Sequence, residues 1–435
     1  MVSLGPAEPC EQKLFISPVC TLMNISSREL LKAIFTLKGS LTPGHVPRRI
    51  IYDDVELAPF KNDAKAAVSI SADFEHNWAF RAWPEEVRNQ KGENERRNIP
   101  FILTLLEKYG IPITWAIVGH LFLESCERGA CGDAHPDMPR PRVNGRFQGD
   151  WYMHDPCTNF RQDPLWYSPD LIQDIIDSKV AHEIGTHTFS HFDFRLKYSS
   201  HDLVQREIEE CTKVMEPFGV RPKSLVFPHN ETEYSYSKLL FDSDIVGIRH
   251  RDAKIRLSYP ERLESGIYRI FESMNLRTTS RYDYVDKVKI FVEEAAKRRT
   301  AYHIFFHPSD PPVLFRDQFR RILEYFCEER ERRRIWVATM AELAAYCEAR
   351  ECAEIQVVKQ LRQIDVMMDS SLDTAKYGEP ELTMLIPSEL APRKIFFEKD
   401  GTLREVHLAS LDFDRQKHRL LVNVPASSKM LRLAF

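Results

Sequence analysis

Two histidines four residues apart, His187 and His191, are the residues whose type and spacing most directly suggest chemistry. The stretch 187–191 reads His-Thr-Phe-Ser-His. On one helical turn, or in a tight loop, two imidazoles at this spacing can point to the same place. Neutral imidazole nitrogen is a good ligand for divalent metals. The pair can therefore hold one metal ion, although such spacing also arises by chance among fifteen histidines.

Two further groups follow apolar runs that read as buried strands. Asp73 and Glu75 end the run 66–72, and in an extended segment residues two apart face the same way. His307 directly follows the apolar run 301–306. Both features also occur without function, the acids in a solvated loop and the histidine at an ordinary strand end. Because these residues occur in the same chain as the histidine pair, we favour one site that contains all of them.

The elements that must position these residues alternate along the chain. Between about 66 and 350, strand-like apolar runs alternate with helix-like segments. Such alternation implies parallel strands with crossover helices, and the length suits a (β/α) barrel. Barrels of this kind carry their chemistry at the carboxyl ends of the strands. Asp73, His187 and His307 all fall at such ends, and we therefore expect them in one site.

Flanking segments differ from this pattern. Residues 1–64 are mixed and rich in proline, and we predict an N-terminal extension packed on a barrel of residues 65–350. After about 351 the runs become short and alternating, with an Asp400-Gly401 turn signal, which predicts a small antiparallel β domain over 351–435. The segment 124–163 shows no period, and a connection that long is usually functional or disordered.

Together the motifs resemble the polysaccharide deacetylase family, whose members carry the NodB homology domain and are similar to carbohydrate esterase family 4. The His-Thr-Phe-Ser-His stretch matches the family's second motif, Asp73 and Glu75 resemble an Asp-x-Glu version of the first, and residues 305–307 resemble the late motif. The resemblance implies a distorted (β/α) barrel and one divalent metal, zinc, held by Glu75, His187 and His191. It also implies Asp73 as general base and His307 as general acid.

One motif departs from the family. Its third motif has an arginine two residues before a proline, whereas Val226 stands two residues before Pro228 here. We expect His229 and Asn230, which follow that proline, to orient the base and contact the substrate. In the long 124–163 segment, Trp151 and His154 are expected to contact a sugar. The alternative for Trp151 is that it anchors this loop to the barrel.

Composition excludes other classes of function. The net charge is −4 and no long basic stretch occurs, which argues against a nucleic-acid partner. Absence of an apolar run of about 18 residues argues against a membrane span. The nine cysteines show no zinc-knuckle spacing, and His120 and His182 are interpreted as core or surface histidines. Reduced thiols and the absence of a secretory signal pattern predict a cytoplasmic protein.

The predicted function is that of a metal-dependent hydrolase that removes an N-acetyl group from a sugar or glycan precursor. Amide hydrolysis needs an activated water, a stabilised oxyanion and a protonated leaving amine, and the residue types above suit these tasks. Two alternatives stay open. One is a hydrolase of another C–N bond, such as a formamide or a cyclic amide, and the other is a catalytically silent barrel that binds a glycan. The oligomeric state is left open.

Overall fold

The computed structural model describes residues 41–141, 149–277, 283–399, 401–406, 411–414 and 418–435. Within them, seven parallel strands form a closed ring in the order β11-β12-β4-β5-β6-β7-β8, because β8 also pairs with β11. The strands are β4 (Ala66–Phe74), β5 (Thr114–Ile117), β6 (Glu183–Thr186), β7 (Ser224–Val226), β8 (Gly247–His250), β11 (Tyr268–Asn275) and β12 (Ala301–Phe306). The predicted distorted (β/α) barrel is confirmed.

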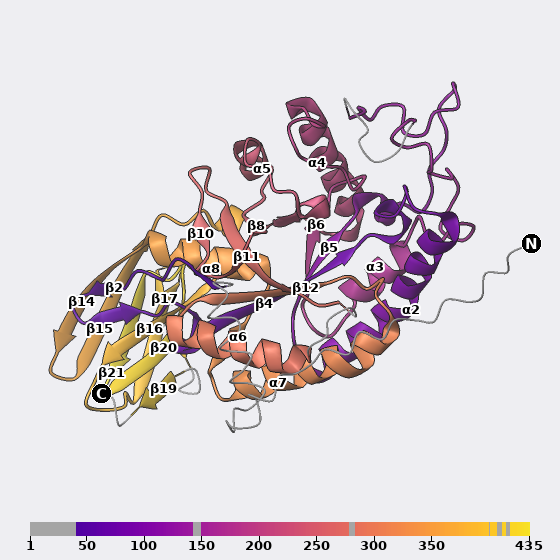
Figure 1. Cartoon of the computed structure of the whole chain (residues 1–435). Helices are drawn as coiled ribbons and strands as arrows, with labels where there is room; N and C mark the ends of the chain where they lie inside the picture. The colour runs from indigo at the N-terminus through magenta and orange to yellow at the C-terminus, as the bar shows by residue number, and fades with distance from the viewer. Residues whose placement is uncertain (1–40, 142–148, 278–282, 400, 407–410, 415–417) are drawn as a thin grey trace, which may run out of the picture. The chain divides into compact units, whose positions relative to one another are not determined.

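Helices surround this ring (Figure 1). They are α2 (Glu85–Tyr109), α3 (Pro169–Ile176), α4 (His201–Met215), α5 (Ser237–Asp242), α6 (Tyr284–Arg298), α7 (Arg320–Glu331) and α8 (Met340–Cys352). Short helical turns are η3 (His76–Trp78), η4 (Gly119–Phe122), η5 (Glu216–Phe218), η6 (Pro228–Asn230) and the π-helical turn η7 (Leu314–Phe319). None of the described helices is long and apolar enough to cross a membrane.

Strand β4 shows why a continuous apolar run predicts a buried strand. All nine of its residues are buried, as expected of a parallel strand covered on both faces. Strand β13 (Ile335–Val337) pairs in parallel with the first three residues of β4, and the next helix, α8, opens with a capping box of Thr339 and Glu342. Strand β11 was not predicted, because Arg269, Glu272 and Ser273 interrupt its apolar pattern.

Beyond α8 the described chain forms two antiparallel five-stranded sheets, in the orders β14-β15-β21-β17-β18 and β19-β20-β16-β3-β2. The strands are β14 (Ala353–Gln360), β15 (Gln363–Ser370), β16 (Glu381–Pro387), β17 (Lys394–Lys399), β18 (Thr402–Val406), β19 (Leu411–Asp414), β20 (Arg419–Pro425) and β21 (Met430–Ala434). A short helix, α9 (Thr374–Tyr377), lies between β15 and β16. The predicted antiparallel β region is confirmed.

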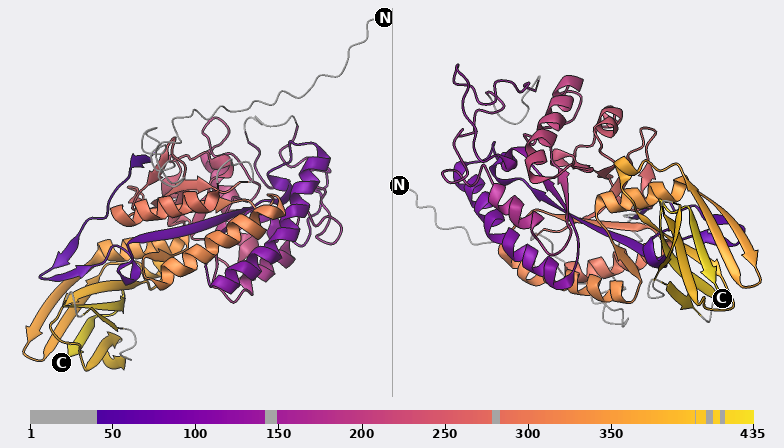
Figure 2. Two further views of the ribbon diagram at one scale, coloured as in Figure 1. Left: turned by 60° about the horizontal axis from the view of Figure 1, so that its bottom comes forward. Right: turned by 180° about the vertical axis from the view of Figure 1, so that it is seen from behind.

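Residues 41–64 are shared between these parts. Strands β2 (Ile50–Tyr52) and β3 (Val55–Leu57) complete the second C-terminal sheet, and the indigo strand lies among the yellow and orange ones in Figure 2. Strand β1 (Leu41–Pro43) instead pairs with β9 (Ile255–Leu257), and β10 (Glu261–Arg262) pairs with β11. The turn η2 (Lys61–Asp63) precedes the barrel. The first 40 residues of the predicted extension lie outside the described residues, and the boundaries at 64 and 350 stay predictions.

Arg350, on helix α8, connects the barrel to the preceding segment 41–64. Its guanidinium is fully buried and donates to the carbonyl oxygens of Arg48, Leu57 and Ala58. A buried charge-assisted hydrogen bond is worth more than a neutral one, and its loss leaves carbonyl groups without a donor.

We therefore expect Arg350→Met to lower the free energy of unfolding by at least about 2 kcal/mol. The same change at Arg393, whose side chain is exposed, should change it by less than about 0.5 kcal/mol. Chemical denaturation of both variants measures the difference. Equal stability of the two variants would contradict the proposed link.

Candidate active site

The predicted residues meet at the carboxyl ends of three barrel strands. Asp73 is the penultimate residue of β4 and Glu75 follows it, His187 follows β6, and His307 follows β12. Parallel strands in a ring place these ends at one rim. The histidine pair does not sit on a helix, since residues 187–191 form a turn.

Glu75, His187 and His191 are buried and converge on one point. Glu75 Oε1 lies 3.0 Å from His187 Nε2 and 3.1 Å from His191 Nε2. His187 Nδ1 lies 2.7 Å from the Val226 carbonyl, to which it donates its proton. The Nε2 lone pair of a neutral His187 then faces the Glu75 carboxylate, an arrangement that a cation between them satisfies. These three residues therefore fit a divalent metal.

The surroundings of His191 and Glu75 favour the protonation states that metal binding requires. Desolvation lowers the pKa of His191 to about 4, so its ring is neutral at pH 7. Burial opposes ionisation of Glu75, but His191 and His187 hold its pKa well below the usual range. A neutral imidazole and an ionised carboxylate are the forms that bind metal.

The backbone around this point is strained. Positive φ angles occur at His76 (46°), Thr188 (66°), His191 (53°), His229 (62°) and Asn230 (57°). Each such non-glycine residue costs on the order of 1–3 kcal/mol, and such residues cluster at functional sites. Five such residues around one point are consistent with a functional site at this rim.

Asp73 has a partner that the sequence interpretation missed. Arg249, the third residue of β8, pairs with both carboxylate oxygens, at 2.6 Å and 2.7 Å. Arg249 also donates to Asn230 Oδ1 at 2.7 Å. The predicted role of orienting the base thus falls first to Arg249, with Asn230 behind it. The signal that could have identified Arg249 is a charged residue near the carboxyl end of an otherwise apolar strand.

Arg249 also sets the charge of Asp73. Burial would raise the pKa of the Asp73 carboxyl, but Arg249, with smaller contributions from His187 and His307, lowers the net value. Asp73 is therefore ionised near neutral pH and able to accept a proton. His307 Nε2 lies 3.7 Å from Asp73 Oδ2 and is partly exposed.

Helix α2 braces this rim from outside. Glu95 accepts the backbone N–H of His76 at 2.5 Å and lies close to that of Glu75. Asn98 donates to the carbonyl oxygens of Pro308 and Asp310, at 2.7 Å and 2.8 Å. One helix thus positions the segments that follow β4 and β12.

A cavity of about 540 Å³ opens at this rim, lined by Asp73, Glu75, His191, His229, Asn230 and His307 among others. Trp151 and His154 are not among its lining residues. Trp151 is buried and donates from Nε1 to Ser190 Oγ at 2.8 Å. For Trp151 the geometry favours the alternative stated from the sequence, an anchor for the long loop.

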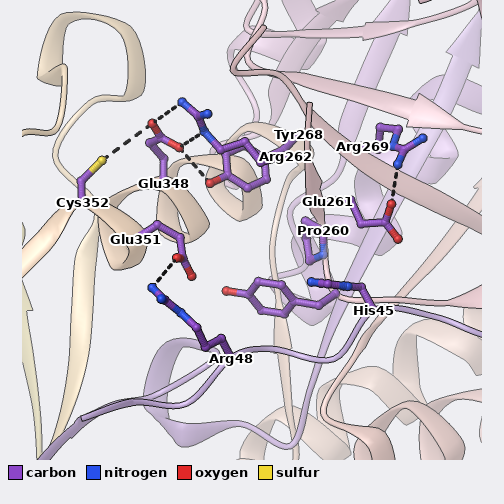
Figure 3. A pocket seen from close by; sticks show the side chains of 11 residues that line it. His45, Arg48, Pro260, Glu261, Arg262, Tyr268, Arg269, Glu348, Glu351 and Cys352 are labelled. Carbon is purple, nitrogen blue, oxygen red and sulfur yellow. Dashed lines mark hydrogen bonds and ion pairs between the residues drawn. The ribbon is translucent and has the colours of Figure 1, made fainter. Parts of the chain in front are cut away.

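A larger cavity of about 640 Å³ lies elsewhere, beside α8 (Figure 3). Its acids are paired: Glu348 accepts from Arg262 and Tyr268, and Glu351 accepts from Arg48. Since the possible metal ligands Glu75 and His191 line the smaller cavity at the strand ends, we assign the chemistry there.

Comparison with known proteins agrees with this assignment. Residues 91–240 match the polysaccharide deacetylase family model. The resemblance to the polysaccharide deacetylase family is confirmed. The matched stretch includes His187 and His191, whereas Asp73, Glu75 and His307 lie outside it. The match supports a hydrolytic deacetylase. No curated protein matches the chain.

Several solved structures are similar to this chain. A candidate polysaccharide deacetylase from Mycobacterium smegmatis has 15% identity and a TM-score of 0.48, over 74% of this chain and 99% of that one. The Puue allantoinase has 12% identity and a TM-score of 0.41, over 66% and 92%. A CE4 family pseudoenzyme from Bacillus anthracis has 10% identity and a TM-score of 0.35, over 70% and 69%. Identities this low carry no inference about the reaction.

We expect Arg249→Lys to lower kcat by at least about tenfold, because lysine keeps the charge but cannot make the bidentate contact with Asp73. Weaker pairing raises the pKa of Asp73, so the acidic limb of the pH profile should move to higher pH. The matched control is Arg262→Lys, which alters a similar pair with Glu348 away from the site. An unshifted acidic limb would remove Arg249 from the positioning of the base.

Proposed function

We propose that this chain is a zinc-dependent hydrolase that removes an N-acetyl group from a sugar or glycan precursor. The observation that carries the proposal is a buried Glu75, His187 and His191 set at a cavity that Glu75 and His191 line together with an ionised Asp73 and His307. The family match supports the reaction class.

Each residue has a task in amide hydrolysis. Asp73, fixed by Arg249, accepts the proton of the attacking water. His307, which lines the same cavity, protonates the departing nitrogen. When bound by Glu75, His187 and His191, a divalent ion supplies a Lewis acid and makes water more acidic. The pairing of Asp73 with Arg249 favours an active enzyme over a silent barrel, because it replaces the arginine missing from the third motif.

The cavity rim suggests the substrate. Trp83 is about half exposed, at 49%, and its ring packs edge-on against Phe80, with centroids 5.5 Å apart. Both line the cavity and offer the apolar surface on which a sugar ring stacks. Lys91, Arg251 and Arg277 also line it, which favours a substrate with an anionic group.

A panel of acylated amines separates the alternatives. It should contain N-acetyl sugars with and without an acidic substituent, N-formyl amines and cyclic amides. Preference for an acidic N-acetyl sugar supports the proposal, and turnover restricted to formamides or cyclic amides supports the other C–N hydrolase.

We expect Asp73→Asn to lower kcat by about 10²–10⁴-fold with full metal content, because the amide cannot accept the proton. His187→Ala should lose both activity and one ion per chain. Asp252→Asn, in a partly exposed pair with Arg256, is the control and should behave as the unmodified chain. Elemental analysis alongside turnover gives the result. Near wild-type turnover of Asp73→Asn would exclude it as the base.

We expect Trp83→Ala to raise KM for a sugar substrate at least about tenfold more than for a minimal acetamide, because only the sugar loses a stacking surface. Trp151→Ala, which removes the loop anchor, should lower the melting temperature and affect both substrates alike. Equal effects of Trp83→Ala on the two substrates would rule out the stacking role.

A further inference from the structure

A second group of metal-binding side chains lies in the connection between β5 and α3, residues 118–168. His120, in the turn η4, meets Cys126, His135 and Asp155, and their ligand atoms lie within 4.8 Å of one another. This group is separate from the Glu75, His187 and His191 set.

The distances suit one small ion. His120 Nε2 lies 3.1 Å from His135 Nε2 and 2.9 Å from Asp155 Oδ2. Asp155 Oδ2 lies 2.7 Å from His135 Nε2 and 3.5 Å from Cys126 Sγ. A tetrahedron built on usual zinc bond lengths has edges of about 3.3 Å between nitrogens or oxygens and about 3.6 Å to sulfur. The cluster is therefore slightly contracted around the space for one ion.

The hydrogen-bond partners of His120 also indicate a bound cation. His120 Nδ1 lies 3.2 Å from the Trp166 carbonyl, so the proton of a neutral ring belongs there. The Nε2 lone pair then faces the Asp155 carboxylate, and the other tautomer moves the same conflict to the Trp166 carbonyl. A metal ion removes it, while a doubly protonated His120 is the metal-free state that an experiment must distinguish.

Further hydrogen bonds hold Asp155 and the turn of His135 in place. The other oxygen of Asp155, Oδ1, accepts from the Cys157 N–H at 2.9 Å and from Tyr167 OH at 3.1 Å, which leaves Oδ2 for the ion. Arg140 donates to the carbonyl oxygens of Ala134, His135 and Met138 and so fixes the turn that carries His135.

We propose that His120, Cys126, His135 and Asp155 bind a second metal ion with a structural role, and that this ion is zinc. A thiolate with two imidazoles selects zinc over magnesium or calcium, which prefer oxygen ligands. The side chains of His120 and Asp155 are fully buried, that of His135 is 12% exposed and Cys126 is partly buried. Four protein ligands fill a tetrahedral site and leave no position for a substrate, which is typical of structural zinc.

This ion would hold the first site in shape. The η4 turn that carries His120 donates from Gly119 N to the Thr188 carbonyl at 2.8 Å and from His120 N to the Phe189 carbonyl at 3.0 Å. The same connection supplies Trp151, which donates to Ser190. Thr188, Phe189 and Ser190, which lie between His187 and His191, thus accept hydrogen bonds from the connection that the ion would hold together.

Elemental analysis of the zinc-loaded full chain should give two ions per chain, and one in either His135→Ala or His187→Ala. After replacement of zinc by cobalt(II), the unmodified chain should show a thiolate-to-cobalt charge-transfer band, because Cys126 is a ligand. Cys126→Ser should abolish the band and lower the melting temperature. His187→Ala should keep it.

Cys131→Ser, an exposed cysteine of the same connection, is the matched control and should retain the band and both ions. The band is read on the unmodified chain, so the proposal stays testable even if the Cys126 variant does not fold. One ion per chain without a band, or a band that survives Cys126→Ser, would overturn the second site without touching the first. Loss of activity in His187→Ala with the band intact separates the two sites.

Discussion

The ion pair between Asp73 and Arg249 is the interaction on which the site depends. The two residues belong to strands that are not neighbours in the ring, so the pair crosses the barrel interior. Removing either partner would leave a buried charge unpaired, at a cost of about 3–5 kcal/mol. The pair therefore requires the strands to stay in register, and in return it keeps Asp73 ionised and aimed at the cavity.

The polar groups below this pair extend the same requirement. Arg249 also donates to Ser71 Oγ at 3.0 Å, and His303 contacts Ser69 and Ser71 at 2.7 Å and 3.0 Å. Burial lowers the pKa of His303 to about 3, so this ring adds no charge to the barrel interior. A small polar network thus surrounds the buried Arg249 guanidinium without placing a second cation beside it.

The sequence predicted what local pattern determines, and the contacts that it missed are long-range. Continuous apolar runs such as β4 and β12, and the residues directly after them, could be read because parallel strands are buried on both faces. Arg249 could not be assigned from position alone, since its partner is 176 residues away. Strand β3 is short and pairs with β16 more than 300 residues later, and β2 pairs with β3, which no local periodicity can reveal.

The histidine turn shows how the remaining long connection enters the chemistry. Thr188 and His191 hold strained backbone conformations that the turn would not keep alone. Glu207 on α4 accepts from the backbone and the hydroxyl of Ser190, at 2.9 Å and 2.6 Å, and the η4 turn supplies donors to the carbonyls of the residues beside it. Strain at a ligand turn persists only when its surroundings determine it more strongly than local preference does. The long connection 118–168 supplies such surroundings. A metal ion bound by His120, Cys126, His135 and Asp155 would fix the conformation of this connection.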